Sequence, residues 1–375
     1  MANFFIFLGF QMTLPTIPLF VQELGGSDQF IGIITGIFTF SALLLRPSAG
    51  HALETKGRQF VYMIGLAIFV ISIGSYAFIT SIVILFIMRC IQGLGWGFST
   101  TATGTIATDL IPESRRGEGM GYFGLSGNLA LAIGPALGLT LYGYISFTAL
   151  FLLCASLGIV AFILSSVIKY KPVDPNAKKV VAPRFDVMEK SALRPSILLF
   201  FITFCFGGIA SFLPLYTAEE GVAGIQIYFF VYAIFLMVTR TFAGQLYDRK
   251  GHIVVFIPGT LLILAAMVLL AWLPNSFVLY LAGALYGLGF GTVQPALQAW
   301  AINQSPANRK GMANATFFSF FDLGVGVGAI GFGFVASALG YSYIYVIAAV
   351  SIVIAILLYV SLLLKDRKLK QQEAV

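Results

Sequence analysis

Twelve apolar segments follow one another along the 375-residue chain, separated by short polar stretches. A helix of about 20 apolar residues crosses the roughly 30 Å hydrocarbon core of a bilayer. Only 10% of the residues are charged, against about 25% in soluble domains, which excludes a single soluble particle. We predict an all-α membrane protein with twelve transmembrane helices at 2–21, 29–49, 60–79, 82–108, 118–142, 146–168, 195–216, 224–246, 253–272, 277–303, 312–337 and 342–364.

The basic residues fall on alternate loops. Of 22 Lys and Arg residues, three lie within predicted spans (Arg46, Arg89 and Arg240), and the rest lie in even-numbered loops or the C-terminal tail. By the positive-inside rule both termini are cytosolic. The net charge of +7 therefore reflects topology and anionic lipid, and we expect no nucleic-acid partner. The first span starts almost at Met1 without a basic leader, which predicts no cleavable signal and a leader that is very short or was trimmed.

Cysteine usage argues against a disulfide and against a metal site. The three cysteines, Cys90, Cys154 and Cys205, lie inside predicted spans without a CxxC spacing. We expect free thiols, no disulfide, no metal site and no cofactor. The two histidines, His51 and His252, are predicted to lie in short loops.

Positions 194 residues apart repeat each other. The matches are Arg46/Arg240, Gly50/Gly244, Gly57/Gly251, Gly93/Gly287, Gly95/Gly289, Gly97/Gly291, Pro112/Pro306, Arg115/Arg309, Gly117/Gly311 and Gly134/Gly328. We predict two parallel six-helix bundles, 1–168 and 194–364, with a polar cytosolic linker at 169–193 and a tail at 365–375. Parallel repeats of six helices occur in one large class of secondary transporter, with the substrate site between the halves near the midplane.

Several motifs carry a family resemblance. The segment GHALETKGRQ (50–59) resembles the loop 2–3 signature of the major facilitator superfamily, although Glu54 replaces its aspartate and Thr55 and Gln59 replace two basic residues. Its second copy, GQLYDRKGH (244–252), keeps Asp248 and Arg249. LFIMRCIQGLGWG (85–97) is similar to the fourth-helix signature of the same superfamily.

Two further motifs resemble the twelve-span drug/proton antiporter subgroup, namely LGFQMTLPTIP (8–18) and GPALG (134–138). The resemblance implies two bundles around a central cavity in a bacterial plasma membrane. It also implies a monomer that exports small amphipathic or drug-like molecules in exchange for protons by alternating access. Two alternatives stay open: an exporter of one metabolite, such as a sugar or a metallophore, and a non-transporting sensor on the same fold.

Asp322 is the only charged residue between Lys310 and Lys365, and it lies in an apolar span. Counting residues from the nearest loop, at 1.5 Å per residue, places both Asp322 and Arg89 near the midplane of the membrane. An ionised side chain at that depth costs about 2.5–3.5 kcal/mol, so such residues are functional candidates. We predict that Asp322 carries the coupled proton and that Arg89 tunes this acid or holds the cavity. In the alternative, Asp322 stays protonated as a hydrogen-bond donor or pairs permanently with Arg89. Arg46 and Arg240 are interpreted as structural residues near the cytosolic surface.

Other polar and small residues are assigned to three groups. In the resembled family helices 1, 4, 7 and 10 line the cavity, and Gln11, Gln92, Gln294 and Gln298 lie on those helices. The other candidate cavity residues are Asn128, the repeat mate of Asp322, and two phenylalanines that could face a hydrophobic substrate, Phe204 and Phe318. The candidate cytosolic gate contains Gly50, Glu54, Gly57, Arg58, Asp109, Gly244, Asp248 and Arg249, and Glu54 and Arg58 can pair with each other or with Asp109. A hinge or seal is predicted at Gly134, Pro135 and Gly138. The alternatives are interhelical hydrogen bonds for the amides, lipid or core contacts for the phenylalanines, and solvated loops for the gate.

An intramembrane enzyme is the remaining class. GLSG (124–127) resembles the Gly-x-Ser-Gly of rhomboid proteases, whose chemistry needs a histidine base. Because both histidines lie in predicted cytosolic loops, at the wrong depth, we expect no enzymatic activity.

Overall fold

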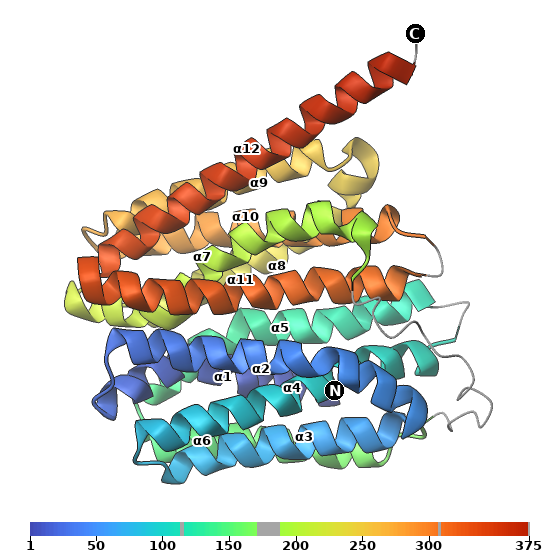
Figure 1. Ribbon diagram of the computed structural model, residues 1–375. Coiled ribbons are helices and arrows are strands. Elements are labelled where there is room, and N and C mark those ends of the chain that lie inside the picture. The colour runs from blue at the N-terminus through green and yellow to red at the C-terminus, as the bar shows by residue number, and fades with distance from the viewer. Residues whose placement is uncertain (113–115, 171–187, 307–308, 374–375) are drawn as a thin grey trace.

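The computed structural model describes residues 1–112, 116–170, 188–306 and 309–373 (Figure 1). Within these ranges the protein contains twelve α-helices and no strand. The helices are α1 (Ala2–Glu23), α2 (Asp28–Thr55), α3 (Arg58–Ser75), α4 (Ile82–Leu110), α5 (Arg116–Tyr142), α6 (Phe147–Ser166), α7 (Leu193–Glu219), α8 (Ile225–Lys250), α9 (Ile253–Ala271), α10 (Ser276–Asn303), α11 (Lys310–Leu339) and α12 (Tyr341–Glu373). All twelve predicted spans correspond to helices.

Eleven of the described helices are long and apolar enough to cross a membrane, and α8 has a shorter apolar part, Ile225–Arg240. A helix satisfies its backbone hydrogen bonds internally, which hydrocarbon surroundings require. Large hydrophobic side chains such as Ile71, Val83, Ile163 and Phe277 are exposed around the bundle. In a soluble protein such exposure would favour aggregation, whereas here it provides the surface for lipid.

Two helices extend well beyond the predicted spans. Helix α2 continues to Thr55 and ends before Gly57, whose φ of 94° lets the chain turn. His51 and Glu54 therefore lie in a helix, and the prediction that His51 lies in a loop was wrong. Helix α12 continues to Glu373, because the tail is rich in Lys, Leu and Gln, which favour helix.

The two halves reproduce the 194-residue offset as contacts. A Cβ atom at Gly93 would lie 2.2 Å from the Phe38 carbonyl oxygen, and one at Gly287 would lie 2.5 Å from the Tyr232 carbonyl oxygen. Both members of each pair, 93/287 and 38/232, are 194 residues apart. The repeated glycines thus hold α4 against α2, and α10 against α8, at the same close separation.

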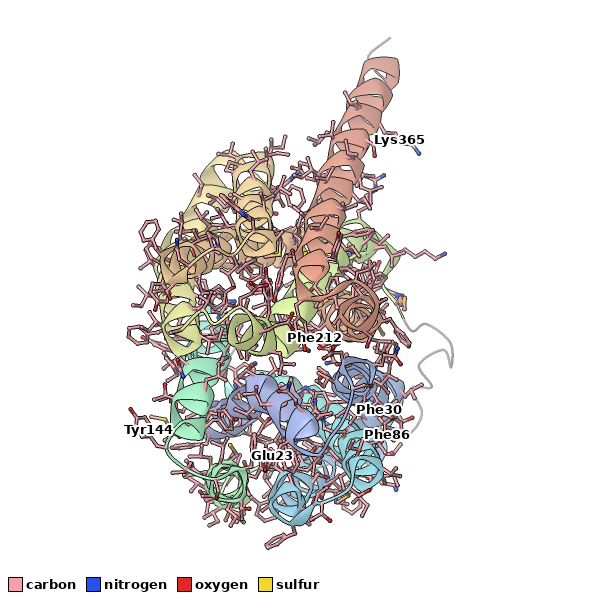
Figure 2. All side chains as sticks on the ribbon, turned by 90° about the vertical axis from the view of Figure 1, so that its left-hand side faces the viewer. Glu23, Phe30, Phe86, Tyr144, Phe212 and Lys365 are labelled. Carbon is pink, nitrogen blue, oxygen red and sulfur yellow. The ribbon has the colours of Figure 1, made fainter. Side chains whose placement is uncertain are left out.

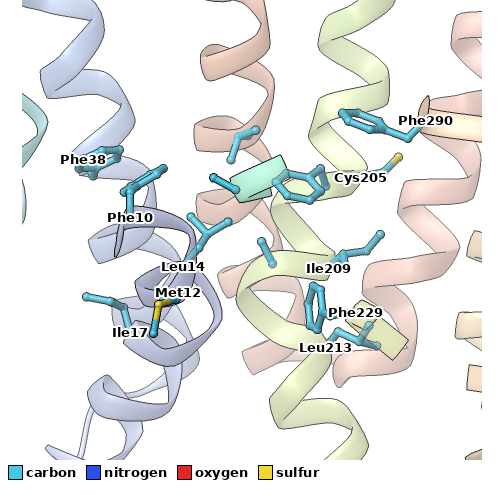
Figure 3. Packing of buried hydrophobic residues seen from close by; sticks show 14 of the residues in the cluster. Phe10, Met12, Leu14, Ile17, Phe38, Cys205, Ile209, Leu213, Phe229 and Phe290 are labelled. Atoms are coloured by element: carbon cyan, nitrogen blue, oxygen red, sulfur yellow. The ribbon is translucent and has the colours of Figure 1, made fainter. Parts of the chain in front are cut away.

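Helices α1–α6 lie in the lower part of Figure 1 and α7–α12 in the upper part. The halves meet mainly where α2 packs on α11 and α5 packs on α8, with α1 and α7 between them. Figure 3 shows buried side chains of α1 and α7 in this region, among them Leu14 and Ile209. We call each of these two helix–helix contacts, α2–α11 and α5–α8, a seam. Polar residues in a seam are candidates for coupling ion binding to movement of the halves.

We name the two ends of the bundle by the loops that they carry. The odd-loop face is the end at which the odd-numbered helices finish, and Figure 2 views the molecule onto it, with Glu23 and Tyr144 near two of its turns. The even-loop face is the opposite end, at which α2, α4, α6, α8 and α10 finish.

Candidate coupling and substrate site

An ion pair joins the two halves. Arg46 on α2 donates a hydrogen bond from Nη2 to Oδ2 of Asp322 on α11. Asp322 lies about 18 Å along α11 from its first residue, Lys310, at 1.5 Å per residue. The two side chains are 19% and 20% exposed, so the pair is largely buried. This places Arg46, which the sequence indicated was structural, at the boundary between the halves.

The seam that contains this pair is closely packed. A Cβ atom at Gly32 would lie 2.4 Å from the Ala329 carbonyl oxygen, and one at Gly36 would lie 2.9 Å from the Gly326 carbonyl oxygen. At the odd-loop face, Tyr341 Oη donates to Asp28 Oδ1 over 2.7 Å. The close contacts between the halves therefore run from Asp28 to Arg46 along α2.

Arg89 belongs to a different cluster. It is 1% exposed, and its Nη1 donates to Gln92 Oε1 over 2.8 Å. Its Nε donates to the Ile34 carbonyl at 3.3 Å, and its guanidinium lies 4.6 Å from the centre of the Phe38 ring. Tyr76 donates to the same Gln92 oxygen over 2.6 Å.

Arg89 thus joins α2 to α4 within one half. Among the described residues Arg89 contacts no carboxylate, and Asp322 pairs with Arg46 instead. The structure does not show the alternative in which Asp322 pairs with Arg89, because Arg46 occupies that role. Depth along each helix placed both residues near the midplane, but depth does not specify the direction in which a side chain points.

A chain of side-chain amides runs through the second half. Arg240 Nη2 on α8 donates to Gln294 Oε1 on α10 over 3.0 Å. Gln294 Nε2 donates to Gln298 Oε1 at 3.4 Å, and Gln298 Nε2 donates to Asn314 Oδ1 at 2.8 Å. The chain links α8, α10 and α11, and Asn314 is a member that the sequence did not single out.

The other candidate cavity residues are dispersed. Gln11 is 7% exposed on α1, and its Oε1 accepts no hydrogen bond from any residue that the structure describes. Asn128 is partly buried on α5. The Phe204 ring lies 4.6 Å from that of Phe332, and the Phe318 ring lies 6.3 Å from that of Phe321. Both phenylalanines therefore contact neighbouring aromatic rings within the second half.

The antiporter-like motif on α5 packs against α1 in the same half. A Cβ atom at Gly134 would lie 2.5 Å from Gln11 Cβ, and one at Gly138 would lie 2.3 Å from the Met12 carbonyl oxygen. Pro135 lies inside the helix between these glycines. The motif therefore serves first to bring α1 and α5 into close contact.

At the even-loop face, Arg58 Nε donates to Asp109 Oδ2 over 2.8 Å, one of the pairings open from the sequence. This contact joins the start of α3 to the end of α4. Of the other predicted gate residues, the helices contain Gly50, Glu54, Gly244, Asp248 and Arg249, but their surroundings lie outside the described residues.

A second charged contact at this face was not predicted. Glu189, just before α7, accepts hydrogen bonds from Arg309 Nε and from the backbone N and Oγ of Ser191. The bonds from Ser191, followed by Arg309, hold the pKa of Glu189 below its ordinary value. The backbone N–H of Glu189 donates to Thr316 Oγ1 on α11. The contacts of Glu189 with Arg309 and Thr316 could not be recognised from the sequence, because these residues lie more than 100 positions away from Glu189.

The described residues hold no group of three or more His, Cys, Asp or Glu side chains placed to bind a metal ion. The charged groups in the described interior are Arg89, Arg240 and the Arg46–Asp322 pair, and amides and hydroxyls surround them. Buried charge between two repeated halves is typical of transporters, in which ionisable intramembrane residues line ion and substrate pathways.

Comparison with known proteins identifies the family. A sequence profile of the Major Facilitator Superfamily matches residues 1–329 and 222–374. The chain belongs to this superfamily. Its relatives include the uncharacterized MFS-type transporter MJ1560 of Methanocaldococcus jannaschii, 26% identical over 336 residues and covering 86% of each chain. The quinolone resistance protein NorA of Staphylococcus aureus is 24% identical over 334 residues, covering 86% of this chain and 84% of NorA.

Solved structures agree with the MFS fold. A mutant of the nucleoside transporter NupG superposes with a TM-score of 0.75 at 15% identity, covering 96% of this chain and 97% of NupG. A POT family transporter in complex with 5-aminolevulinic acid gives 0.77 at 14% identity, covering 96% and 94%. The protein is thus a multi-pass MFS transporter, and at these identities the structural likeness concerns the fold alone.

Proposed function

We propose that the protein exports small amphipathic or drug-like molecules in exchange for protons, with Asp322 as the proton-carrying acid. The observation that carries this proposal is the Arg46–Asp322 ion pair, because it links a titratable group directly to the contact between the halves. The relation to a quinolone resistance protein supports drug-like substrates. We also propose a division into bundles 1–168 and 194–364, with the even-loop face and both termini in the cytosol.

The coupling follows from the state of the carboxyl group. When Asp322 has released its proton to the cytosol, its carboxylate pairs with Arg46 and holds the α2–α11 seam closed. Separating two largely buried charges is costly, so the seam stays shut until bound substrate offsets that cost. Once the seam opens towards the odd-loop face, Asp322 is away from Arg46 and accepts a proton from external water. When the seam closes again, the neutral acid meets Arg46 and releases its proton to the cytosol, so that the ion pair forms again.

Arg46 replaces Arg89 as the proposed electrostatic partner of the acid. Arg89 and Gln92 are proposed to hold α2 and α4 together, and Gln11, Gln294 and Gln298 to face substrate. The contact Arg58–Asp109 is proposed to stabilise the cytosolic ends of α3 and α4 as part of a gate. The function proposed is transport and not enzymatic, since the relatives are transporters.

The test is transport by purified protein in proteoliposomes. A quinolone and a neutral amphipathic dye are supplied, and accumulation is measured with and without an imposed pH gradient. Asp322→Asn should lose gradient-driven accumulation at least tenfold while retaining exchange of substrate for labelled substrate, because the rocking cycle remains and the proton does not. Glu220→Gln, which alters an exposed acid at the odd-loop face, is the control. Full gradient-driven accumulation by Asp322→Asn would refute the role of this acid.

A further inference from the structure

The two seams between the halves are unequal in charge. On α2 and α11, Arg46 pairs with Asp322. The 194-residue repeat places Arg240 on α8 at the position of Arg46, and Asn128 on α5 at the position of Asp322. Helices α5 and α8 pack together as α2 and α11 do. The second seam therefore has the arginine of the pair and an amide in place of the acid.

Arg240 lacks an acidic partner among the described residues. Its Nη2 donates to Gln294 Oε1 over 3.0 Å, and its buried Nε has no hydrogen-bond partner among the residues that the structure describes. Gln294 is itself only 7% exposed. Leaving a largely buried guanidinium with a neutral acceptor and an unused donor is unfavourable, because the cost of dehydrating the charge is only partly offset.

The groups around Arg240 suit an anionic ligand. Arginine presents its N–H donors in a planar fork that matches a carboxylate. The side-chain amides of Gln294, Gln298 and Asn314 continue from Arg240 towards α11. On α8, two turns before Arg240, the buried hydroxyl of Tyr232 also has no partner in the described part of the chain. Arg240 Nε and the Tyr232 hydroxyl are thus unused donors, and no carboxylate among the described residues accepts from them.

We propose that the seam between Arg240 and Asn128 binds the carboxylate of an amphipathic substrate, which occupies the place that the Asp322 side chain fills beside Arg46. The inference rests on the proposed function and narrows its substrate class to molecules that carry an acid group. The bound anion compensates the positive charge of Arg240 only while α5 and α8 are packed against each other. Substrate binding thereby acts directly on a contact between the halves.

The experiment measures binding in detergent without a pH gradient, so its outcome is separate from that of gradient-driven transport. The probes are a quinolone carboxylic acid and its methyl ester. Wild-type protein should bind the acid about 10- to 100-fold more tightly than the ester, the range expected for hydrogen bonds to a charged group. Arg240→Gln should remove this preference.

A second variant tests the inference even if Arg240→Gln does not fold. Asn128→Asp supplies a carboxylate from the protein itself and should reduce the acid-over-ester preference at least tenfold. Glu220→Gln, at an exposed acid of the odd-loop face, should keep the wild-type preference. Equal binding of acid and ester by wild-type protein, or an undiminished preference in Asn128→Asp, would overturn the inference. Loss of proton-driven transport alone would bear on the proposed coupling and leave this inference standing.

Discussion

Asp322 on α11 receives its hydrogen bond from Arg46, a residue of the opposite half of the molecule. The acid that could carry a proton is therefore also part of the contact that must break when the halves move apart. Coupling between ion and conformation requires a ligand to interact differently with the two conformations. In the proposed function a proton on Asp322 meets this requirement, because it removes one charge from the pair that joins the two halves in this structure.

The glycines of the α2–α11 seam should be essential for closing it. Gly32→Ala places a methyl group 2.4 Å from the Ala329 carbonyl oxygen, so the helices must separate. We expect at least a tenfold loss of transport in proteoliposomes with the fold retained. Gly331→Ala on α11 is the matched control, since no described residue would lie within 4 Å of a Cβ there, and it should stabilise the helix by up to about 1 kcal/mol. Equal transport by both variants would show that the seam need not be tight.

The bond from Tyr341 to Asp28 should help to keep the odd-loop face closed. Tyr341→Phe removes one hydrogen bond between the halves, worth about 1 kcal/mol, which corresponds to roughly a fivefold shift towards the open seam. The measurement is maleimide labelling of Thr39→Cys in a background without the native cysteines, because Thr39 is 7% exposed and lies against Gly326. Tyr343→Phe, at an exposed position, should leave the labelling rate unchanged. An unaltered rate in Tyr341→Phe would exclude a gating role.

Arg89 should matter for stability rather than for coupling. Arg89→Met keeps much of the side-chain volume but removes the donors to Gln92 and the Ile34 carbonyl. We expect the free energy of unfolding to fall by roughly 1–3 kcal/mol, seen as a lower Tm in detergent. The ratio of gradient-driven transport to exchange should stay near the wild-type value. Should that ratio collapse while Tm is maintained, Arg89 would have to act on the proton after all.

Glu189 should make the stability of the even-loop face depend on pH. Its pKa is depressed below the ordinary value of 4.5, chiefly by the hydrogen bonds from Ser191. A depressed pKa means that the carboxylate stabilises the folded protein above pH 4.5 and that this contribution is lost as the pH falls through the folded-state pKa. Glu189→Gln should lower Tm at pH 7 and narrow the difference in Tm between pH 7 and pH 4. Glu220→Gln serves as the comparison, and an identical pH dependence in both variants would contradict the assignment.

Much of the fold could be predicted from residue patterns. Each helix was identified by its run of apolar residues, since the length of a span depends only on the thickness of the bilayer. The repeat was equally visible, because Gly93 and Gly287 need the same close contact in each half. The extension of α2 through His51 was missed because the apolar pattern ends before the helix does. The role of Arg46 was missed because its partner lies 276 residues away.

The sequence by itself determined the number and order of the membrane helices, their duplication and the family to which the chain belongs. These properties depend on hydropathy and spacing, which are local along the chain. Only the tertiary structure decided that Asp322 meets Arg46, that Arg89 joins Gln92 and that Arg240 has an amide for its partner. The tilt and rotation of each helix select which side chains face one another, and these follow from contacts with helices far away in sequence.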